Sequence, residues 1–279
     1  MTNSLKKNDP FQIFRYIILS VLTVFEIFPL LLVICNSFRP DAEVKASPIG
    51  LPHLGYFDNY IDTWKMGNYG RAYLNTFFIM AFVIVIVLLF DGLAAYALAR
   101  LNLKYKGIIG GYFFVAMSLP SFLYIITVYS KMREMGLVDT PWSLIIIYSA
   151  NNIPFTLILM RTFMAGIPKE LEEAARIDGC GDMQAFWKIT LPICKPIFLT
   201  AALLCACNVW NEYLWSNTFL PTEINKTVAT KYVVFTGQYS SNMARIYTAS
   251  VISIVPICFL YILFSRKFIE GLTSGSVKS

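Results

Sequence analysis

The sequence predicts an all-α membrane protein whose six transmembrane helices leave both termini on the cytoplasmic side (N-in/C-in). Of its 279 residues, 57% are hydrophobic and only 14% are charged, whereas roughly a quarter of the residues in a typical soluble domain are charged. Six windows are apolar over the ~20 helical residues that cross a bilayer core. No separate soluble domain fits between them, so we expect residues 1–279 to form one transmembrane domain.

The predicted spans carry very few charges. Glu26, Asp91 and Glu212 each lie alone in one window, and the other windows contain no charged residue. The first window follows a basic segment, as in a signal peptide, but it is too long for one and no small-residue cleavage site follows it, so we expect an uncleaved anchor. The six spans are residues 16–35, 74–98, 108–130, 142–160, 197–215 and 246–265.

The basic residues in the loops predict the orientation. With the N-terminus inside, most of the 23 lysine and arginine residues fall on the cytoplasmic side, in agreement with the positive-inside rule. The bias is sharpest in the short turn ARLNLKYKG, residues 99–107. The net charge of +6 is therefore explained by membrane topology, and we expect no nucleic-acid partner.

Residues that could form a catalytic or metal centre are scarce. His53 is the only histidine, and none of the six cysteines lies clearly in an external loop, so we expect no histidine-based centre and no disulfide framework. The nearest approach to a phosphate-binding loop, GLTSGSVKS at residues 271–279, has no lysine directly after its second glycine and no strand before it. The sequence therefore predicts a chain that is no enzyme, binds no cofactor or metal and does not hydrolyse ATP itself.

Four prolines fall well inside predicted spans, namely Pro29, Pro120, Pro154 and Pro256. Each frees a backbone carbonyl and bends its helix, which is tolerated where neighbouring helices or a cavity satisfy the backbone. Bent helices are common in transporters and also occur in inert bundles, so the prolines favour transport only slightly.

The intramembrane carboxylates Glu26 and Asp91 allow two interpretations. A charged side chain near a helix centre costs about 2.5–3.5 kcal/mol, so such a residue is a candidate functional group. Alternatively, each carboxylate hydrogen-bonds to a neighbouring helix or to freed backbone, and this is the interpretation that we favour.

Polar residues deep in the fourth and fifth spans are better candidates for a solute pathway. Amides bind hydroxyl groups and aromatic rings stack on C–H faces, so these residue types suit a neutral polyhydroxylated solute. The same side chains also form interhelical hydrogen bonds, so pathway lining and helix packing are both possible. The candidates are Asn151, Asn152, Asn208, Trp210, Asn211 and Glu212.

Residues 172–196 are the most polar long stretch of the chain, and we call the loop that contains them, residues 166–196, the 166–196 segment. They predict a helix, a glycine turn and a second helix on the cytoplasmic side. Pro168 suits a first helical position, acidic residues crowd the first turn, and Gly179 suits a C-terminal stop. Asp182 is expected to cap the second helix, which is expected to close at Leu191 and Pro192.

The predicted helices of this segment have two possible roles. They can rest on lipid or on their own bundle as an amphipathic hairpin, or they can dock into a partner protein. For docking, Ala174, Ala175 and Gly179 leave the backbone close to the surface, while Glu173 and Asp178 offer charges to cations of a partner. The residues alone favour neither role.

The same segment carries a known pattern, EAARIDG followed by ITLP, with nine residues between Gly179 and Ile189. This pattern resembles the EAA loop of permease subunits in bacterial ATP-binding-cassette (ABC) importers. The stretches KMREMGLVDTPWSLII, WNEYLW and GLTSGSVK resemble the carbohydrate-uptake permeases of that family, particularly the maltose-permease second-subunit type. Cys180 stands where that family usually has alanine, a change between small residues.

The resemblance implies a multi-pass subunit of the bacterial cytoplasmic (inner) membrane whose EAA helix docks into a cytoplasmic ATPase. It also implies a second, different permease subunit, two copies of the ABC ATPase that hold ATP and Mg, and an extracytoplasmic solute-binding protein that delivers a sugar. The implied coupling residues are Glu173, Ala174, Ala175, Asp178, Gly179, Leu191 and Pro192, with residues 271–278 as a second cytoplasmic contact.

Two alternative transport functions stand beside this expectation. The first is an importer permease of the same kind for another small solute, since the sequence does not name the substrate. The second is a self-sufficient secondary transporter, which usually needs an ion-coupling site and often an internal repeat. Neither feature is evident in the sequence, so the importer permease is the prediction that we carry forward.

Overall fold

The computed structural model describes residues 10–53, 55–238 and 241–273, and the regular elements within them are all helical. The predicted all-α class is therefore confirmed. The chain divides into two compact units, one of Met1–Asn68 with Tyr232–Ile254 and the other of Tyr69–Lys231 with Val255–Ser279.

The first unit contains α1 (Pro10–Ser37), α2 (Asp41–Ala46), α3 (Asp58–Met66) and parts of α13 (Val228–Gln238) and α14 (Met243–Thr273). Polar contacts gather at the end of α1. The Asn59 amide donates to the backbone oxygens of Ser37 and Arg39, each at 2.9 Å, and Thr248 donates to Ser37 at 3.2 Å. The apolar window of α1 is 0% buried within the chain, so its side chains are available to lipid or to another protein.

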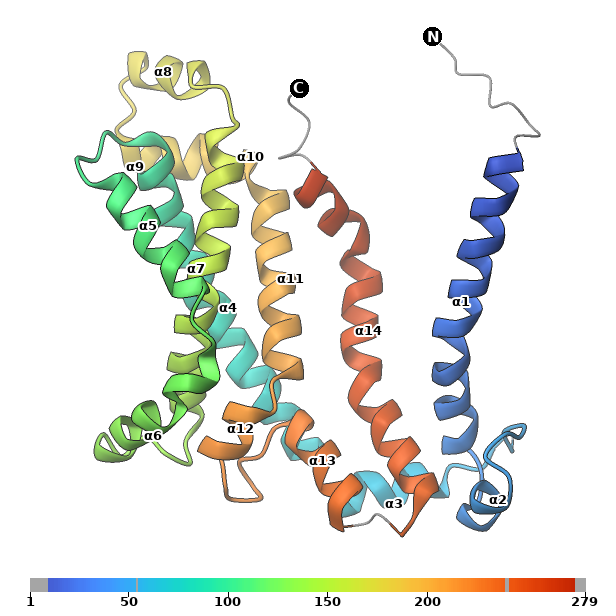
Figure 1. The fold of residues 1–279 in the computed structure, drawn as a ribbon. Coiled ribbons are helices and arrows are strands. Elements are labelled where there is room, and N and C mark those ends of the chain that lie inside the picture. The colour runs from blue at the N-terminus through green and yellow to red at the C-terminus, as the bar shows by residue number, and fades with distance from the viewer. Residues whose placement is uncertain (1–9, 54, 239–240, 274–279) are drawn as a thin grey trace. The chain divides into compact units, whose positions relative to one another are not determined.

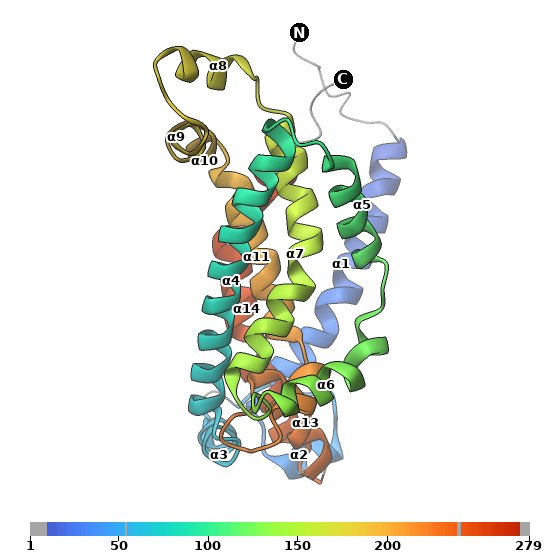
Figure 2. The same cartoon turned by 90° about the vertical axis from the view of Figure 1, so that its left-hand side faces the viewer.

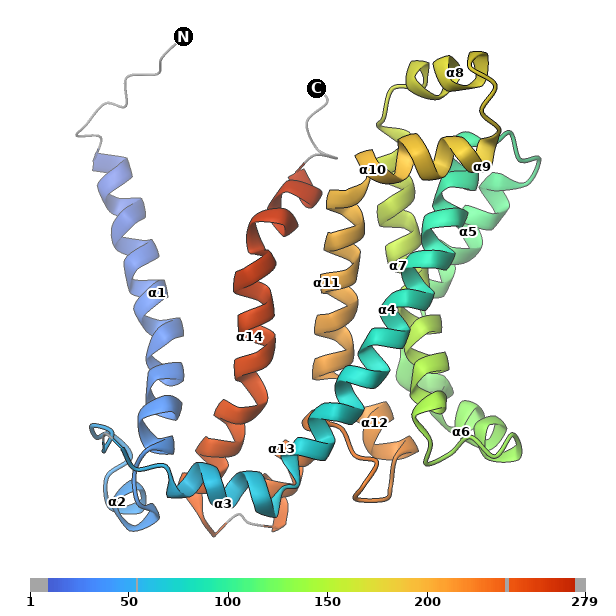
Figure 3. The same ribbon diagram turned by 180° about the vertical axis from the view of Figure 1, so that it is seen from behind.

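The second unit is built around α4 (Tyr69–Arg100), α7 (Pro141–Ala165) and α11 (Lys195–Asn211), which pack side by side (Figure 1). Two clusters of buried apolar side chains fill the spaces between these helices. At one end of the three helices lie α8 (Glu170–Ile177), α9 (Asp182–Ala185), η2 (Phe186–Thr190) and α10 (Leu191–Ile193). At the opposite end lie α6 (Ile125–Glu134) and α12 (Leu214–Phe219), as Figure 3 shows.

Four of the predicted spans coincide with continuous helices that are long and apolar enough to cross a membrane, namely α1, α4, α7 and α14. Pro29, Pro154 and Pro256 lie inside these helices without interrupting them. The described residues hold up to 6 such spans if each of 2 bent helix pairs counts as one.

The predicted span at residues 108–130 is one of these bent pairs. Its first half, α5 (Lys106–Met117), and its second half, η1 (Ser121–Tyr124) with α6, meet at 88° (Figure 2). Pro120 lies directly before η1, where it has no N–H to donate and its ring opposes a continuing helix. The prolines inside α1, α7 and α14 do not interrupt their helices, so the break is specific to this position.

The predicted span at residues 197–215 is too long, because α11 ends at Asn211. Glu212 has an extended backbone, with φ −76° and ψ 118°. Its carboxylate accepts hydrogen bonds from the backbone N–H groups of Trp215 at 2.9 Å and Ser216 at 3.0 Å. These N–H groups belong to the first turn of α12 and have no helical partner, so the acid starts a new helix rather than continuing the old one.

Candidate functional site

Helix α8 forms the first half of the 166–196 segment. Its first turn contains Glu170, Glu172 and Glu173, where negative charge is favourable to the helix dipole. The carbonyl of Lys169 accepts hydrogen bonds from the backbone N–H groups of Glu172 and Glu173, each at 3.0 Å. The acidic cluster therefore stabilises a helix of only 8 residues.

Gly179 ends this first half. Its N–H donates to the Arg176 carbonyl at 3.0 Å, and the N–H of Cys180 donates to the Ala175 carbonyl at 2.9 Å. These two bonds form a Schellman motif, which needs a left-handed residue after the helix. Gly179 has φ +84°, a conformation that costs a residue with a β-carbon about 1–2 kcal/mol. A β-carbon here would meet no atom within 4 Å, so backbone conformation, and not space, requires glycine.

The second half of the segment departs from two expectations. Gly181, and not Asp182, precedes α9, and no side chain caps that helix; Asp182 instead accepts a hydrogen bond from Arg176 at 2.7 Å. The helical path, expected to close at Leu191 and Pro192, ends one residue later, at Ile193, and then turns by 76° into α11. Pro192 lies in the first turn of α10, where a missing N–H interrupts no bond.

The seven candidate coupling residues differ in exposure. Ala175 is 6% exposed and packs against its own chain, and Leu191 is half-buried. Two apolar residues of α8 that are not among the seven, Leu171 and Ile177, are also exposed, and Ile177 is 87% exposed. An apolar and acidic surface results, which we call the outer face of α8. Its residues are Leu171, Glu173, Ala174, Ile177, Asp178 and Gly179, while the exposed Pro192 lies apart on α10.

Glu172 has a contact that the sequence analysis missed. Its side chain is 7% exposed and forms an ion pair with Arg100, whose side chain is 2% exposed, at 3.1 Å between Oε1 and Nε. Thr190 also donates to the Glu172 carboxylate, at 2.9 Å. The one signal in the sequence is Arg100 itself, a basic residue at the end of the second span, which the positive-inside rule explains equally well.

A polar cavity of about 590 Å³ opens between α7 and the end of α11. Polar residues of the predicted fourth span and of the predicted fifth span, which are distant in the sequence, lie together in its wall. Five of the six predicted pathway residues are among those that line it, namely Asn151, Asn152, Asn208, Asn211 and Glu212. The rest of the lining is Ser121, Phe122, Tyr148, Cys207, Val209, Tyr213, Leu214 and Trp215.

Hydrogen bonds across the cavity wall fix its amides. Asn208 donates to the Asn152 side-chain oxygen at 2.8 Å, and Asn152 donates to the Tyr148 carbonyl at 2.8 Å. The Tyr148 hydroxyl donates to Glu212 at 2.6 Å, so the carboxylate that starts α12 also holds α7. The Asn208 amide is exposed, and no described residue donates a hydrogen bond to its side-chain oxygen, which can therefore accept one from a solute hydroxyl.

Trp210 does not line this cavity. Its side chain is 3% exposed and lies against Tyr73 and Phe77 of α4, with ring centroids at 5.7 and 5.5 Å. Consecutive helical residues point in different directions, so Trp210 faces α4 while Asn208 and Asn211 face the cavity. We therefore assign Trp210 to helix packing.

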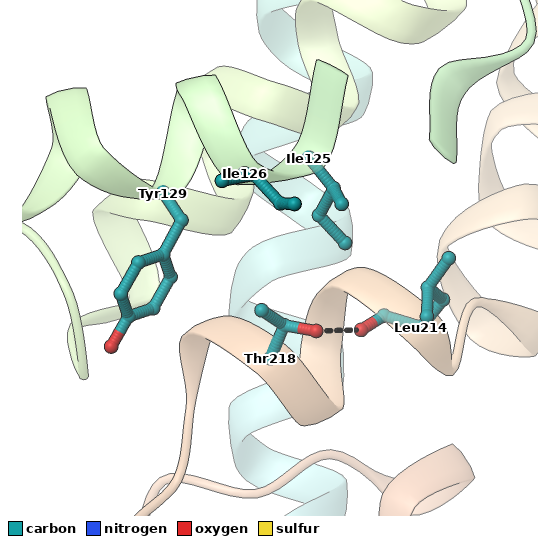
Figure 4. Close-up of a pocket in the computed structure, with 5 residues that line it drawn as sticks. All are labelled: Ile125, Ile126, Tyr129, Leu214 and Thr218. Carbon is teal, nitrogen blue, oxygen red and sulfur yellow. Dashed lines mark hydrogen bonds between the residues drawn. The ribbon is translucent and has the colours of Figure 1, made fainter. Parts of the chain in front are cut away.

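An apolar pocket of about 460 Å³ lies between α6 and α12 and shares Leu214 with the polar cavity (Figure 4). Ile125 and Ile126 face it from α6. The Thr218 hydroxyl donates to the Leu214 carbonyl at 2.7 Å, so this donor is already used. The pocket adds apolar surface beside the cavity rather than a second set of polar groups.

The two intramembrane carboxylates lie in different surroundings. Asp91 on α4 is fully buried and accepts a hydrogen bond from Thr156 on α7, so it joins two helices as the favoured interpretation predicts. Glu26 is exposed on α1. Among the described residues no group of three or more acidic, histidine or cysteine side chains is arranged to hold a metal ion.

Residues 92–272 match a protein family described as "Binding-protein-dependent transport system inner membrane component". A sulfoquinovosyl glycerol transport permease of Agrobacterium fabrum is 30% identical, over 95% of this chain and 93% of that protein. An arabinooligosaccharide transport permease of Halalkalibacterium halodurans is 33% identical, over 90% of this chain and 91% of that protein.

Solved structures give a concordant result. A bacterial ABC transporter that imports the acidic polysaccharide alginate matches with a TM-score of 0.81 and 26% identity, over 96% of this chain and 100% of that chain. A second alginate transporter, solved with its pentasaccharide-bound periplasmic protein, matches in fold with a TM-score of 0.62 and 18% identity. The match covers 92% of this chain and 95% of that chain.

Proposed function

The chain belongs to the family of binding-protein-dependent transport system inner membrane components, and we propose that the solute it transports is a neutral sugar or oligosaccharide. Members of this family are permease subunits of importers, and their ATPase is a separate subunit. The chain is thus a multi-pass transport subunit rather than an enzyme. It works with a second permease, the ATPase and a solute-binding protein.

The observation that carries the sugar assignment is the polar cavity. Its wall presents four asparagine amides together with the exposed rings of Phe122 and Tyr213. Amides satisfy hydroxyl groups in either direction, and aromatic rings offer flat apolar surface to sugar C–H faces. A relative that transports arabinooligosaccharides, which are neutral, supports the same solute class.

The charges of the cavity favour a neutral solute. No lysine, arginine or histidine is among its lining residues, and its one carboxylate, Glu212, is engaged by Tyr148 and by the start of α12. An anionic saccharide would lose water there and gain no cation in return, which is unfavourable. The lining of this cavity therefore lacks the cationic side chains that would compensate the charge of an acidic polysaccharide.

The test compares substrates in the complete transporter. The complex is purified through a tag on this chain, reconstituted with its binding protein, and offered neutral oligosaccharides or alginate oligosaccharides of matched length. We expect ATP-dependent uptake of a neutral oligosaccharide and none of alginate. Uptake of the acidic series alone, or of a non-carbohydrate solute alone, would overturn the assignment.

The outer face of α8 supports a second part of the proposal, that this surface docks on the ATPase. It combines exposed apolar groups, Leu171 and Ile177, with the acids Glu173 and Asp178, as a protein contact requires. Under this proposal the α8 end of the second unit lies on the cytoplasmic side, as in the N-in, C-in orientation predicted from the basic residues. Residues 274–278 of the expected second contact lie outside the described residues.

A further inference from the structure

We propose that Arg100 is a positioning residue that fixes α8 to the end of α4, so that a displacement of α8 displaces α4. This inference rests on the proposed docking of α8 and adds the route by which docking reaches the membrane helices. Arg100 touches neither the outer face of α8 nor the polar cavity.

The Arg100 guanidinium contacts the 166–196 segment at two places, just before α8 and on α8 itself. Its Nε pairs with Glu172 on α8 at 3.1 Å, and its Nη2 donates to the Ile167 carbonyl, just before α8, at 2.8 Å. Thr190 on η2 donates to the same Glu172 oxygen at 2.9 Å. One arginine at the end of α4 therefore holds the entry, the first helix and, through Glu172, the second half of the 166–196 segment.

Burial makes this ion pair different from the other one in the segment. The Arg176 and Asp182 side chains are 50% and 52% exposed, and such pairs contribute little because water and salt screen them. Arg100 and Glu172 are 2% and 7% exposed, so loss of either partner leaves the other buried and uncompensated. The hydrogen bond from the planar guanidinium to the Ile167 carbonyl is directional, whereas the contact of its Nε with Glu172 is an ion pair without hydrogen-bond geometry.

Apolar contacts fasten the second half of the segment to the same helix. The Phe186 ring of η2 lies 5.2 Å from the Tyr96 ring of α4, centroid to centroid. Gly92, one turn before Tyr96 on α4, lies beside the same Phe186 ring, because a β-carbon there would lie 3.6 Å from the end of that ring. Both halves of the segment are thus attached to α4, and not to a flexible loop.

From α4 the contacts continue to the cavity. The single Thr156 hydroxyl proton on α7 is shared between two acceptors, the Asp91 carboxylate on α4 and the Asn152 carbonyl, which lies 2.8 Å from the hydroxyl oxygen. Asn152 in turn binds Asn208 on the cavity wall. A helix that carries Arg100 at its end and Asp91 in its middle is therefore mechanically connected to the proposed solute site.

The first test measures the geometry without transport. Spin labels are placed at the exposed positions Ile177 on α8 and Phe90 on α4, in a complex whose native cysteines have been replaced. We expect a narrow distance distribution that becomes broad in Arg100→Gln and in Glu172→Gln. The matched control is Lys131→Gln, which removes an exposed ion pair on α6 and leaves the distribution narrow. A distribution that stays narrow in both Arg100→Gln and Glu172→Gln would overturn the proposal.

The second test measures coupling in reconstituted complexes. With ATPase bound, Arg100→Gln and Glu172→Gln should import about tenfold less sugar per ATP hydrolysed, and the double exchange Arg100→Glu with Glu172→Arg should recover a large part. Native sugar-to-ATP ratios in both single variants would contradict the proposal, as would an exchange no better than either single variant. If Arg100→Gln fails to insert, Glu172→Gln and the exchange decide the outcome.

A wild-type complex that imports no sugar would refute the proposed function but not the role of Arg100, because the spin-label distances do not depend on which solute is transported.

Discussion

The 166–196 segment and the polar cavity are both polar, but they use their polar side chains in opposite ways. In the cavity the amides bind one another and the backbone, and still face open volume, as Asn208 does beside Asn152. In the segment the acids are divided: Glu172 is buried against Arg100, whereas Glu173 next to it is exposed. One run of acids therefore contains a buried anchor, Glu172, and an exposed acid of the proposed docking surface, Glu173, and burial separates the two.

The largest effect is expected from Gly179→Asp at the end of α8. The aspartate adds bulk and charge to the outer face and about 1–2 kcal/mol of backbone strain, so uptake should be abolished while the chain still inserts. Gly136→Asp is the matched control, because Gly136 also has a positive φ, +68°, and lies between α6 and α7. Uptake and bound ATPase are measured together; if both survive in Gly179→Asp, the outer face is not the docking surface.

A smaller effect is expected from Asn152→Leu and Asn208→Leu in the cavity. Each removes one partner of a hydrogen bond and leaves the other unsatisfied, which costs about 1–3 kcal/mol. We expect sugar uptake to fall roughly tenfold, with ATPase association unchanged. Asn217→Leu, an exposed position on α12, serves as the control. Unchanged uptake kinetics in both cavity variants would show that the amides only hold helices together.

A third prediction concerns a polar cluster that belongs to neither region. Burial raises the pKa of Asp139, but hydrogen bonds from Thr222 and Asn225 outweigh it and hold the pKa below its ordinary value. A carboxyl whose folded pKa is lowered adds stability above its ordinary pKa and loses it as the pH falls through the folded value. The Tm of the complex should thus fall more steeply below about pH 4 in the wild type than in Asp139→Asn. Equal slopes would contradict this contribution.

The smallest effect is expected from Trp210→Phe. This ring packs against Tyr73 and Phe77 outside the cavity, so the change should lower the free energy of unfolding by about 1 kcal/mol and leave the KM for sugar unchanged. A raised KM with unchanged stability would return Trp210 to the solute pathway.

Local patterns predicted a large part of this structure. Hydropathy located the continuous helices α1, α4, α7 and α14, and the glycine of the EAARIDG motif located the end of α8, because both depend on neighbouring residues in the chain. Pro120 lies at a break between helices and Pro154 lies inside a continuous helix, although both fall inside predicted apolar spans. No local pattern contains that information.

Long-range contacts explain the features that local sequence patterns did not predict. Glu172 appeared to be one acid of a charged first turn, and only folding brings Arg100 to it. Trp210 and Asn208 share a short motif, and the rotation of α11 decides which of them faces the cavity. Asp182 suits an N-cap by residue type, but Arg176 from the preceding helix binds it instead.

We propose that the outer face of α8 receives a separate ATPase while the cavity passes a neutral sugar. The most direct measurement is sugar uptake by proteoliposomes that contain this chain with its partner permease, ATPase and binding protein. We predict uptake that requires both ATP and the binding protein and is lost in Gly179→Asp. Uptake by this chain alone, driven by an ion gradient without ATP, would contradict the account.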